Sequence, residues 1–86
     1  MVDHKVPASA DALRAAILER YEQLSKRLQQ IARYVLDEPN AVGLETLAVL
    51  ADRSGVQPSA IVRFAKSFGF EGATQMQRLF RDELLS

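Results

Sequence analysis

Apolar residues recur along most of the chain at the three- and four-residue spacing of amphipathic helices, and no stretch of any length alternates as a strand would. The pattern predicts an all-α fold, a compact bundle of about five helices. A first helix is expected from about residue 9 to 24, and a second from 25 to 36. Whether these two are continuous stays open. The sequence Glu38-Pro39-Asn40 ends the second helix, because the residue before a proline avoids the helical region.

The second half of the chain contains the clearest signals for where helices begin and end. Thr46 is expected to cap a short third helix that Gly55 ends, because glycine readily adopts the left-handed conformation of a helix terminus. Pro58 opens a fourth helix that reaches about Phe68, and a fifth is expected over residues 73–85. Residues 46–69 therefore indicate a homeodomain-like helix-turn-helix, a motif whose second helix enters the major groove of DNA.

The fourth predicted helix has two faces. Its core-facing stripe consists of Ile61, Phe64, Ala65 and Phe68. The remaining arc is small or polar, with two cations and no acid, and consists of Ser59, Ala60, Arg63, Lys66 and Ser67. Cations on this arc would release counterions from a phosphate backbone, and an arginine can bind guanine in a bidentate manner. Together with Gln57, which precedes the helix, these residues form the predicted DNA-reading face.

Charge is unevenly distributed in a chain whose 11 Lys and Arg balance its 11 Asp and Glu. Residues 26–33 contain three cations and no acid, and residues 53–81 contain five cations and one acid. Within the second window, Arg53 and Arg78 are candidate phosphate contacts. Thr46 is another, because free backbone N–H groups gather at the start of a helix. The excess of positive charge near the predicted motif favours an anionic partner.

Length and composition limit the classes of protein to consider. A chain of 86 residues is expected to form one domain, here residues 9–86 after a flexible leader over residues 1–8. No uninterrupted apolar run approaches the roughly 20 residues of a membrane span or the apolar core of a secretory signal. The absence of cysteine excludes disulfides and thiolate metal sites. We expect a soluble, cytoplasmic protein.

Catalysis has little support in the sequence. His4 is the single histidine and lies in the expected leader. The adjacent carboxylates at 37–38 and at 82–83 point in different directions on a helix, and the four glycines do not form a phosphate-binding loop. We therefore expect no enzyme activity, no cofactor and no metal site.

A longer pattern covers roughly residues 25–85. It comprises the run LAVLADRSGVQPSAIVRFAKSFGFEG at 47–72 and, before it, IARYVL at 31–36. This pattern resembles the N-terminal domain of the RpiR/MurR family of bacterial transcriptional regulators. Gln57 departs from the resemblance, since the family commonly has a serine or threonine cap there. Either the helix begins slightly differently, or Gln57 contacts DNA.

The resemblance implies a DNA-binding domain that belongs to a regulator of sugar metabolism. It implies a homodimer on an inverted-repeat operator and a sugar-isomerase-like effector domain that senses a phosphorylated sugar. That effector domain is expected to be absent from this chain, so no small-molecule ligand is expected on it.

Two other classes of function stay open. The domain could be a helical protein-interaction or dimerisation module without direct DNA readout, with a binding surface centred on Leu13, Ile17 and Tyr21. The stripe on the first helix could equally cover the domain's own core. RNA binding by the same motif is a weaker alternative, because no feature marks single-strand recognition.

Overall fold

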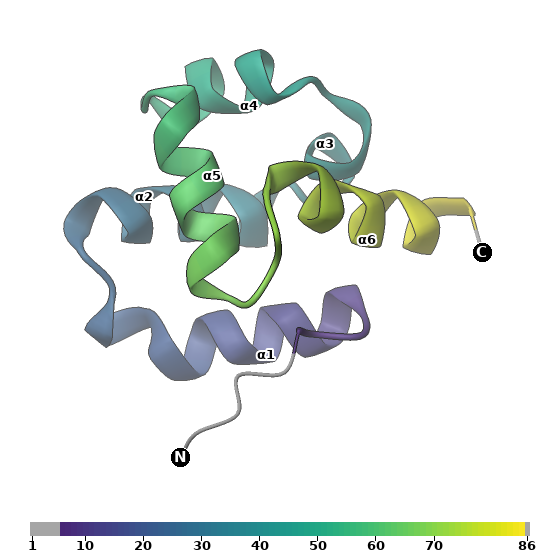
Figure 1. The fold of residues 1–86 in the computed structure, drawn as a ribbon, viewed down its shortest axis with the longest axis horizontal. Helices are drawn as coiled ribbons and strands as arrows, with labels where there is room; N and C mark the ends of the chain where they lie inside the picture. Colours follow the sequence, from purple (N-terminus) through teal and green to yellow (C-terminus); the bar gives the residue numbers. More distant parts are fainter. Residues whose placement is uncertain (1–5, 86) are drawn as a thin grey trace.

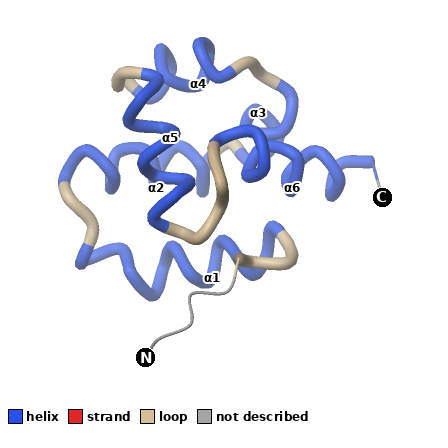
Figure 2. Tube along the Cα trace, viewed as in Figure 1, coloured by secondary structure: helices blue, strands red, loops and turns tan. Residues whose placement is uncertain are grey.

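The computed structural model describes residues 6–85, and these form α-helices and one turn of 3₁₀ helix with no strand among them (Figures 1 and 2). The elements in chain order are α1 (Ala10–Arg20), η1 (Tyr21–Gln23), α2 (Lys26–Asp37), α3 (Pro39–Leu44), α4 (Leu47–Ser54), α5 (Pro58–Ser67) and α6 (Ala73–Leu85). The predicted all-α fold is confirmed. Of the expected leader, residues 1–5 lie outside the described part, and residues 6–8 are not helical.

Serine hydroxyls begin the first two helices and settle whether they are continuous. Ser9 accepts a hydrogen bond from the backbone N–H of Ala12 at 3.0 Å, and Ser25 accepts one from that of Leu28 at 3.2 Å. Such caps satisfy N–H groups that have no partner inside the helix. Between them, Leu24 has an extended backbone (φ −77°, ψ 149°). Helices α1 and α2 are therefore separate.

The sequence prediction did not include α3. Glu38 ends α2 as expected, with a non-helical backbone (φ −129°, ψ 61°). Pro39 then occupies the first position of a new helix, where its missing N–H costs nothing. The same residue therefore ends one helix and starts the next, and the bundle has six α-helices in the described residues rather than five.

Helix α3 packs very closely on α6. A Cβ placed on Gly43 would lie 2.8 Å from the backbone nitrogen of Arg81, so only glycine permits this approach. The buried side chain of Gln77 donates to the carbonyl oxygens of Val42 (3.3 Å) and Glu45 (2.7 Å). Arg81 Nε donates to the carbonyl of Gly43 at 3.2 Å. Figure 1 shows the two helices overlapping on the side of the molecule where the chain ends.

Helix α1 covers the core of its own domain. Leu13 and Ile17 are 0% exposed and pack in one cluster with Phe64 of α5 and Phe80 of α6. Arg14 adds an ion pair to Glu83 of α6 at 3.3 Å. The alternative binding surface centred on Leu13, Ile17 and Tyr21 is thus wrong, because the first two are buried and Tyr21 is partly buried against the same core.

Candidate nucleic-acid interface

Helices α4 and α5 are joined by a tight turn at residues 55–57. Gly55 has a positive φ of 74°, and its N–H donates to the carbonyl of Asp52 at 3.1 Å. The N–H of Val56 donates to the carbonyl of Ala51 at 3.0 Å. Pro58 is the first residue of α5. The predicted cap, turn and helix start are all confirmed, because each depends on residues adjacent in sequence.

The turn is also held from α2. The side-chain amide of Gln30 donates to the carbonyl of Ser54 at 2.5 Å and approaches that of Gly55 at 3.4 Å. The hydroxyl of Ser54 is buried and donates to the carbonyl of Leu50 at 2.6 Å. The bonds from Gln30 satisfy carbonyl groups that the end of α4 leaves unpaired, and they fix the direction in which the chain enters α5.

One face of α5 is buried against the other helices. Ile61, Phe64 and Ala65 belong to the core cluster, and Phe68 follows at the end of the helix. The rings of Phe64 and Phe68 lie with centroids 5.0 Å apart at a tilt of 48°. This interlocking aromatic packing sets the rotation of α5 about its axis, so the opposite face must point outward.

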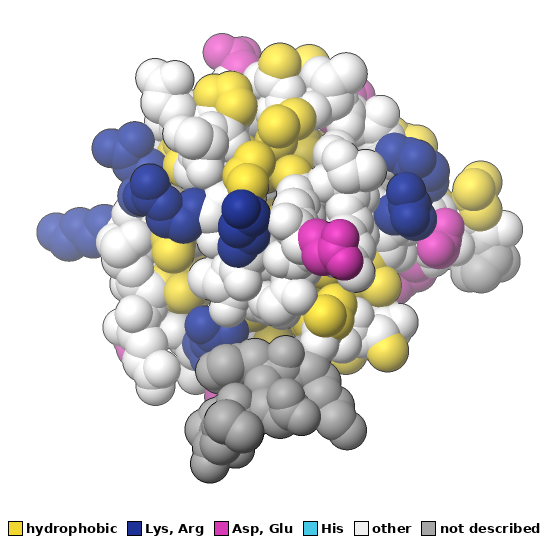
Figure 3. All heavy atoms as spheres, viewed as in Figure 1, with side chains coloured by type: hydrophobic (Ala, Val, Ile, Leu, Met, Phe, Trp, Pro, Cys, Tyr) yellow, Lys and Arg dark blue, Asp and Glu magenta, His cyan; other side chains and the backbone are white. Residues whose placement is uncertain are grey.

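The outward face of α5 carries positive and polar side chains. Gln57, Ser59, Arg63 and Lys66 are all exposed, and α5 has no acidic residue. The side chain of Gln57 makes no capping hydrogen bond, which leaves its amide available to a partner. Figure 3 shows lysine and arginine side chains gathered on the left of the view, where α2 begins and α5 runs. We call Gln57, Ser59, Arg63 and Lys66 the reading face.

Two residues of the predicted arc are placed differently. Ala60 is 8% exposed and belongs to the core, because it precedes Phe64 by four residues and so lies on the same face of the helix. Its assignment to the outward arc was wrong. Ser67 is half-buried, and its hydroxyl donates to the carbonyl of Phe64 at 2.7 Å. Ser67 therefore lies at the edge of the reading face, with its hydroxyl already engaged.

Thr46 and Arg53 lie at the two ends of α4, the helix that precedes the reading face. The Thr46 hydroxyl accepts from the N–H of Val49 at 3.2 Å, which leaves the first N–H groups of α4 directed outward. Arg53 is exposed in the last turn of the same helix. Both positions suit contact with phosphate groups.

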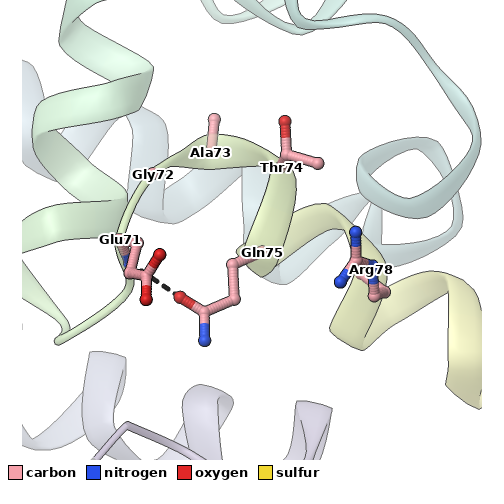
Figure 4. Close-up of a pocket in the computed structure, with 6 residues that line it drawn as sticks. All are labelled: Glu71, Gly72, Ala73, Thr74, Gln75 and Arg78. Atoms are coloured by element: carbon pink, nitrogen blue, oxygen red, sulfur yellow. Dashed lines mark hydrogen bonds between the residues drawn. The ribbon is translucent and has the colours of Figure 1, made fainter.

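Arg78 stands in a different setting, on α6. It lines a hollow of about 480 Å³ with Glu71, Gly72, Ala73, Thr74 and Gln75 (Figure 4). There the backbone N–H of Glu71 donates to the side-chain oxygen of Gln75 at 2.7 Å. The carboxylate of Glu71 shares this hollow, which makes it a poorer anion site than a cation alone would suggest.

The part of the chain that the structure describes shows neither a candidate metal site nor a candidate membrane-spanning helix. Residues 6–85 contain no group of three His, Cys, Asp or Glu side chains that could hold a metal ion. None of the described helices is long and apolar enough to cross a membrane. His4 lies outside the described residues, so its expected lack of a role stays a prediction.

Two short helices joined by a glycine turn, the second with one buried face and one acid-free exposed face, define a helix-turn-helix, a DNA-binding class of domain. The model of the helix-turn-helix domain of the rpiR family matches residues 12–85, and the chain belongs to this family. It is 29% identical over 70 residues to the uncharacterized HTH-type transcriptional regulator YfhH of Escherichia coli (strain K12). That stretch is 81% of this chain and 25% of the relative, so the chain spans about a quarter of the relative's length. No solved structure matches the chain.

Proposed function

We propose that this domain binds double-stranded DNA sequence-specifically, with α5 in the major groove, as the DNA-binding part of a bacterial transcriptional regulator. The observation that carries the proposal is the reading face, which exposes two cations, a hydroxyl and an unbonded amide with no acid beside them on α5. The aromatic packing behind it keeps these groups in fixed positions, as readout of base edges requires.

The residues of the interface have different roles in this proposal. Arg63, in the middle of the exposed face, would bind a guanine edge through two hydrogen bonds. Gln57 and Ser59, at the start of α5, would reach neighbouring bases, and Lys66 would contact phosphate as a point charge. Thr46, Arg53 and Arg78 would position the domain through the backbone of the DNA. Ser67, whose hydroxyl donates to Phe64, would border the groove without a phosphate bond. Ala60 would act from inside, as part of the packing under the helix.

The context of the whole regulator rests on the family. A homodimer would place two copies of α5 on an inverted repeat, with half-sites one helical turn or a multiple apart. A separate, sugar-isomerase-like domain would sense a phosphorylated sugar and make the protein a regulator of sugar metabolism. Because chromosomal DNA is the target, the proposed place of action is the cytoplasm.

The test is selection from a library of random DNA duplexes by the immobilised protein. Dense display lets two copies engage one duplex, which offsets the weak binding of a single small domain. Wild type, Arg63→Ala and Arg27→Ala would be compared, because Arg27 is an exposed arginine outside the reading face. We expect wild type and Arg27→Ala to enrich the same inverted repeat and Arg63→Ala to lose preference at one position per half-site. Absence of enrichment by folded wild-type protein would overturn the proposal.

A further inference from the structure

A second hollow, this one basic, lies on α2, outside the helix-turn-helix itself. It has a volume of about 400 Å³ and is lined by Lys26, Gln29, Gln30 and Arg33. Two cations and two amides therefore face one space with no carboxylate among them. Glu22 precedes Lys26 by four residues across the break between η1 and α2, and the two side chains form no ion pair. None of the described acids pairs with Arg33. The hollow is thus positively charged.

Three of the four lining side chains are already fixed. The amide of Gln29 donates to the carbonyl of Tyr21 at 2.9 Å, and Arg33 Nε donates to the hydroxyl of the same tyrosine at 2.7 Å. Gln30 donates to Ser54 at 2.5 Å. The bond to the tyrosine hydroxyl uses only Nε of Arg33, so the two terminal amino groups of Arg33 remain available to a ligand. A ligand entering this hollow therefore costs little side-chain entropy, which is the condition for an efficient anion site.

The hollow is joined to the helix-turn-helix by Gln30, whose amide nitrogen holds the carbonyl groups of Ser54 and Gly55 directly before α5. Helix α2 also packs against both α4 and α5. The left side of Figure 3, where lysine and arginine gather, covers the start of α2 as well as α5. A duplex bound along α5 would thus continue past the α2 hollow.

From this placement we infer that the α2 hollow binds a phosphate group of the DNA backbone beside the stretch read by α5. This inference rests on the proposed function and extends the interface to a helix outside the motif. A phosphate diester fits the chemistry, because Lys26 and the terminal nitrogens of Arg33 supply charge-assisted donors. The hollow beside Arg78 suits a phosphate less well, since Glu71 would repel it.

The experiment measures binding of the full chain to the selected duplex and to a scrambled duplex over a range of salt concentrations. Lys26→Gln and Arg33→Gln are each expected to weaken binding to both duplexes by the same factor. Each should make the fall of the logarithm of the binding constant with the logarithm of salt concentration less steep by about one, as expected for the loss of one phosphate contact. Arg27→Gln is the matched control, because it removes an exposed charge from the same helix but does not line the hollow.

A second arm locates the phosphate. Neutral methylphosphonate linkages are placed one at a time along the flanks of the selected site. We expect one flanking position to weaken wild-type binding but not that of the Lys26→Gln, Arg33→Gln double variant. Because Arg33 is bonded to Tyr21, thermal unfolding of each variant is recorded, and Lys26→Gln alone, which removes no such bond, carries the conclusion if Arg33→Gln unfolds.

The outcomes separate this inference from the proposed function. If Arg63→Ala changes the sequence preference while Lys26→Gln behaves like Arg27→Gln, the proposed function stands and the phosphate contact at α2 is overturned. A further outcome is that inorganic phosphate shifts the backbone amide NMR signals of Lys26 and Arg33 while no methylphosphonate linkage weakens duplex binding. In that case the hollow is a site for free phosphate, and the inference is again wrong. If no duplex binds to wild type, both fail together.

Discussion

The guanidinium of Arg20 lies over the ring of Phe68, with Cζ of the arginine 4.4 Å from the ring centroid. Arg20 is the last residue of α1. Its guanidinium also donates from Nη1 to the carbonyl of Ser67, the last residue of α5, at 2.9 Å. A cation at the C-terminal end of a helix is favourable because unpaired carbonyl groups collect there. Arg20 therefore ties the far end of α5 to α1, while Gln30 holds the near end.

We expect Arg20→Ala to lower the free energy of unfolding by about 1–3 kcal/mol, because a cation–π contact and a charge-assisted hydrogen bond are lost together. Arg20→Lys should recover only part of the loss, since an ammonium cannot make the stacked, planar contact. Urea denaturation measures both, with Arg27→Ala as an exposed control expected to stay within about 0.5 kcal/mol of wild type. Equal free energies of unfolding for Arg20→Ala and Arg27→Ala would show that the contacts of Arg20 do not stabilise the fold.

Removal of Arg63 and removal of Arg53 are predicted to weaken DNA binding in different ways. On the selected duplex, Arg63→Ala should cost about 1–3 kcal/mol of binding free energy, with much less lost on a scrambled duplex, because a base contact distinguishes sequences. Arg53→Ala should weaken both duplexes alike and reduce the salt slope by about one, because a phosphate contact does not. Fluorescence anisotropy titrations at several salt concentrations measure both quantities. The same uniform loss for both variants would place Arg63 on phosphate.

Gly55→Ala should destabilise the domain by about 1–2 kcal/mol, because an L residue is strained at a φ of 74°. The new Cβ would also lie 2.8 Å from the amide nitrogen of Gln30 and so disturb the bond that holds the turn. Gly72→Ala is the matched control, since a Cβ added there would meet no atom within 4 Å and the φ of Gly72 is not left-handed. Thermal unfolding should show a clear loss for Gly55→Ala and little change for Gly72→Ala. Equal effects would contradict the role of the turn.

The buried position of Ala60 gives a prediction that opposes the sequence interpretation. Ala60→Leu should cost about 1–3 kcal/mol of stability, because three more carbons must enter a packed core. Ser59→Leu adds a side chain of the same size one residue earlier, on the exposed face, and should change stability by no more than about 0.5 kcal/mol. Chemical denaturation of the pair decides the orientation of α5. A larger loss for Ser59→Leu would mean that α5 is rotated.

Helix ends set by neighbouring residues could be predicted from the sequence. Ser9, Thr46, Gly55 and Pro58 each act on backbone groups within four residues, so their effect does not depend on the rest of the fold. Of the residues predicted from the sequence to face DNA, four are exposed as expected: Gln57, Ser59, Arg63 and Lys66. The error at Ala60 came from drawing the arc too widely, although the spacing to Phe64 already placed it on the buried side. Binding of DNA by these residues stays a prediction.

Features that depend on distant segments could not be predicted in this way. Whether the chain continues as a helix after Pro39 depends on packing against α6, more than thirty residues later. The contacts of Arg20 with Phe68 and of Gln30 with Ser54 join residues 48 and 24 positions apart, and no local pattern marks them. The cations at residues 26–33 were visible in the sequence, but only the fold brings two of them into one hollow.

The close approach of α3 to α6 at Gly43 supplies the last prediction. Gly43→Ala should cost about 1–3 kcal/mol or more, because the added methyl would meet backbone rather than a flexible side chain: 2.8 Å from the nitrogen of Arg81 and 3.0 Å from the carbonyl carbon of Phe80. Relieving the clash must move α3 away from α6 and strain the bonds from Gln77 and Arg81. Since the reading face lies on α5, the folded fraction should keep the wild-type ratio of affinities for the selected and scrambled duplexes, while any shift of Thr46 or Arg78 weakens binding to both alike. Thermal unfolding and anisotropy titration well below the midpoint measure the two effects separately. A stable Gly43→Ala variant, or a folded one with an altered sequence preference, would contradict this separation between the α3–α6 contact and the reading face.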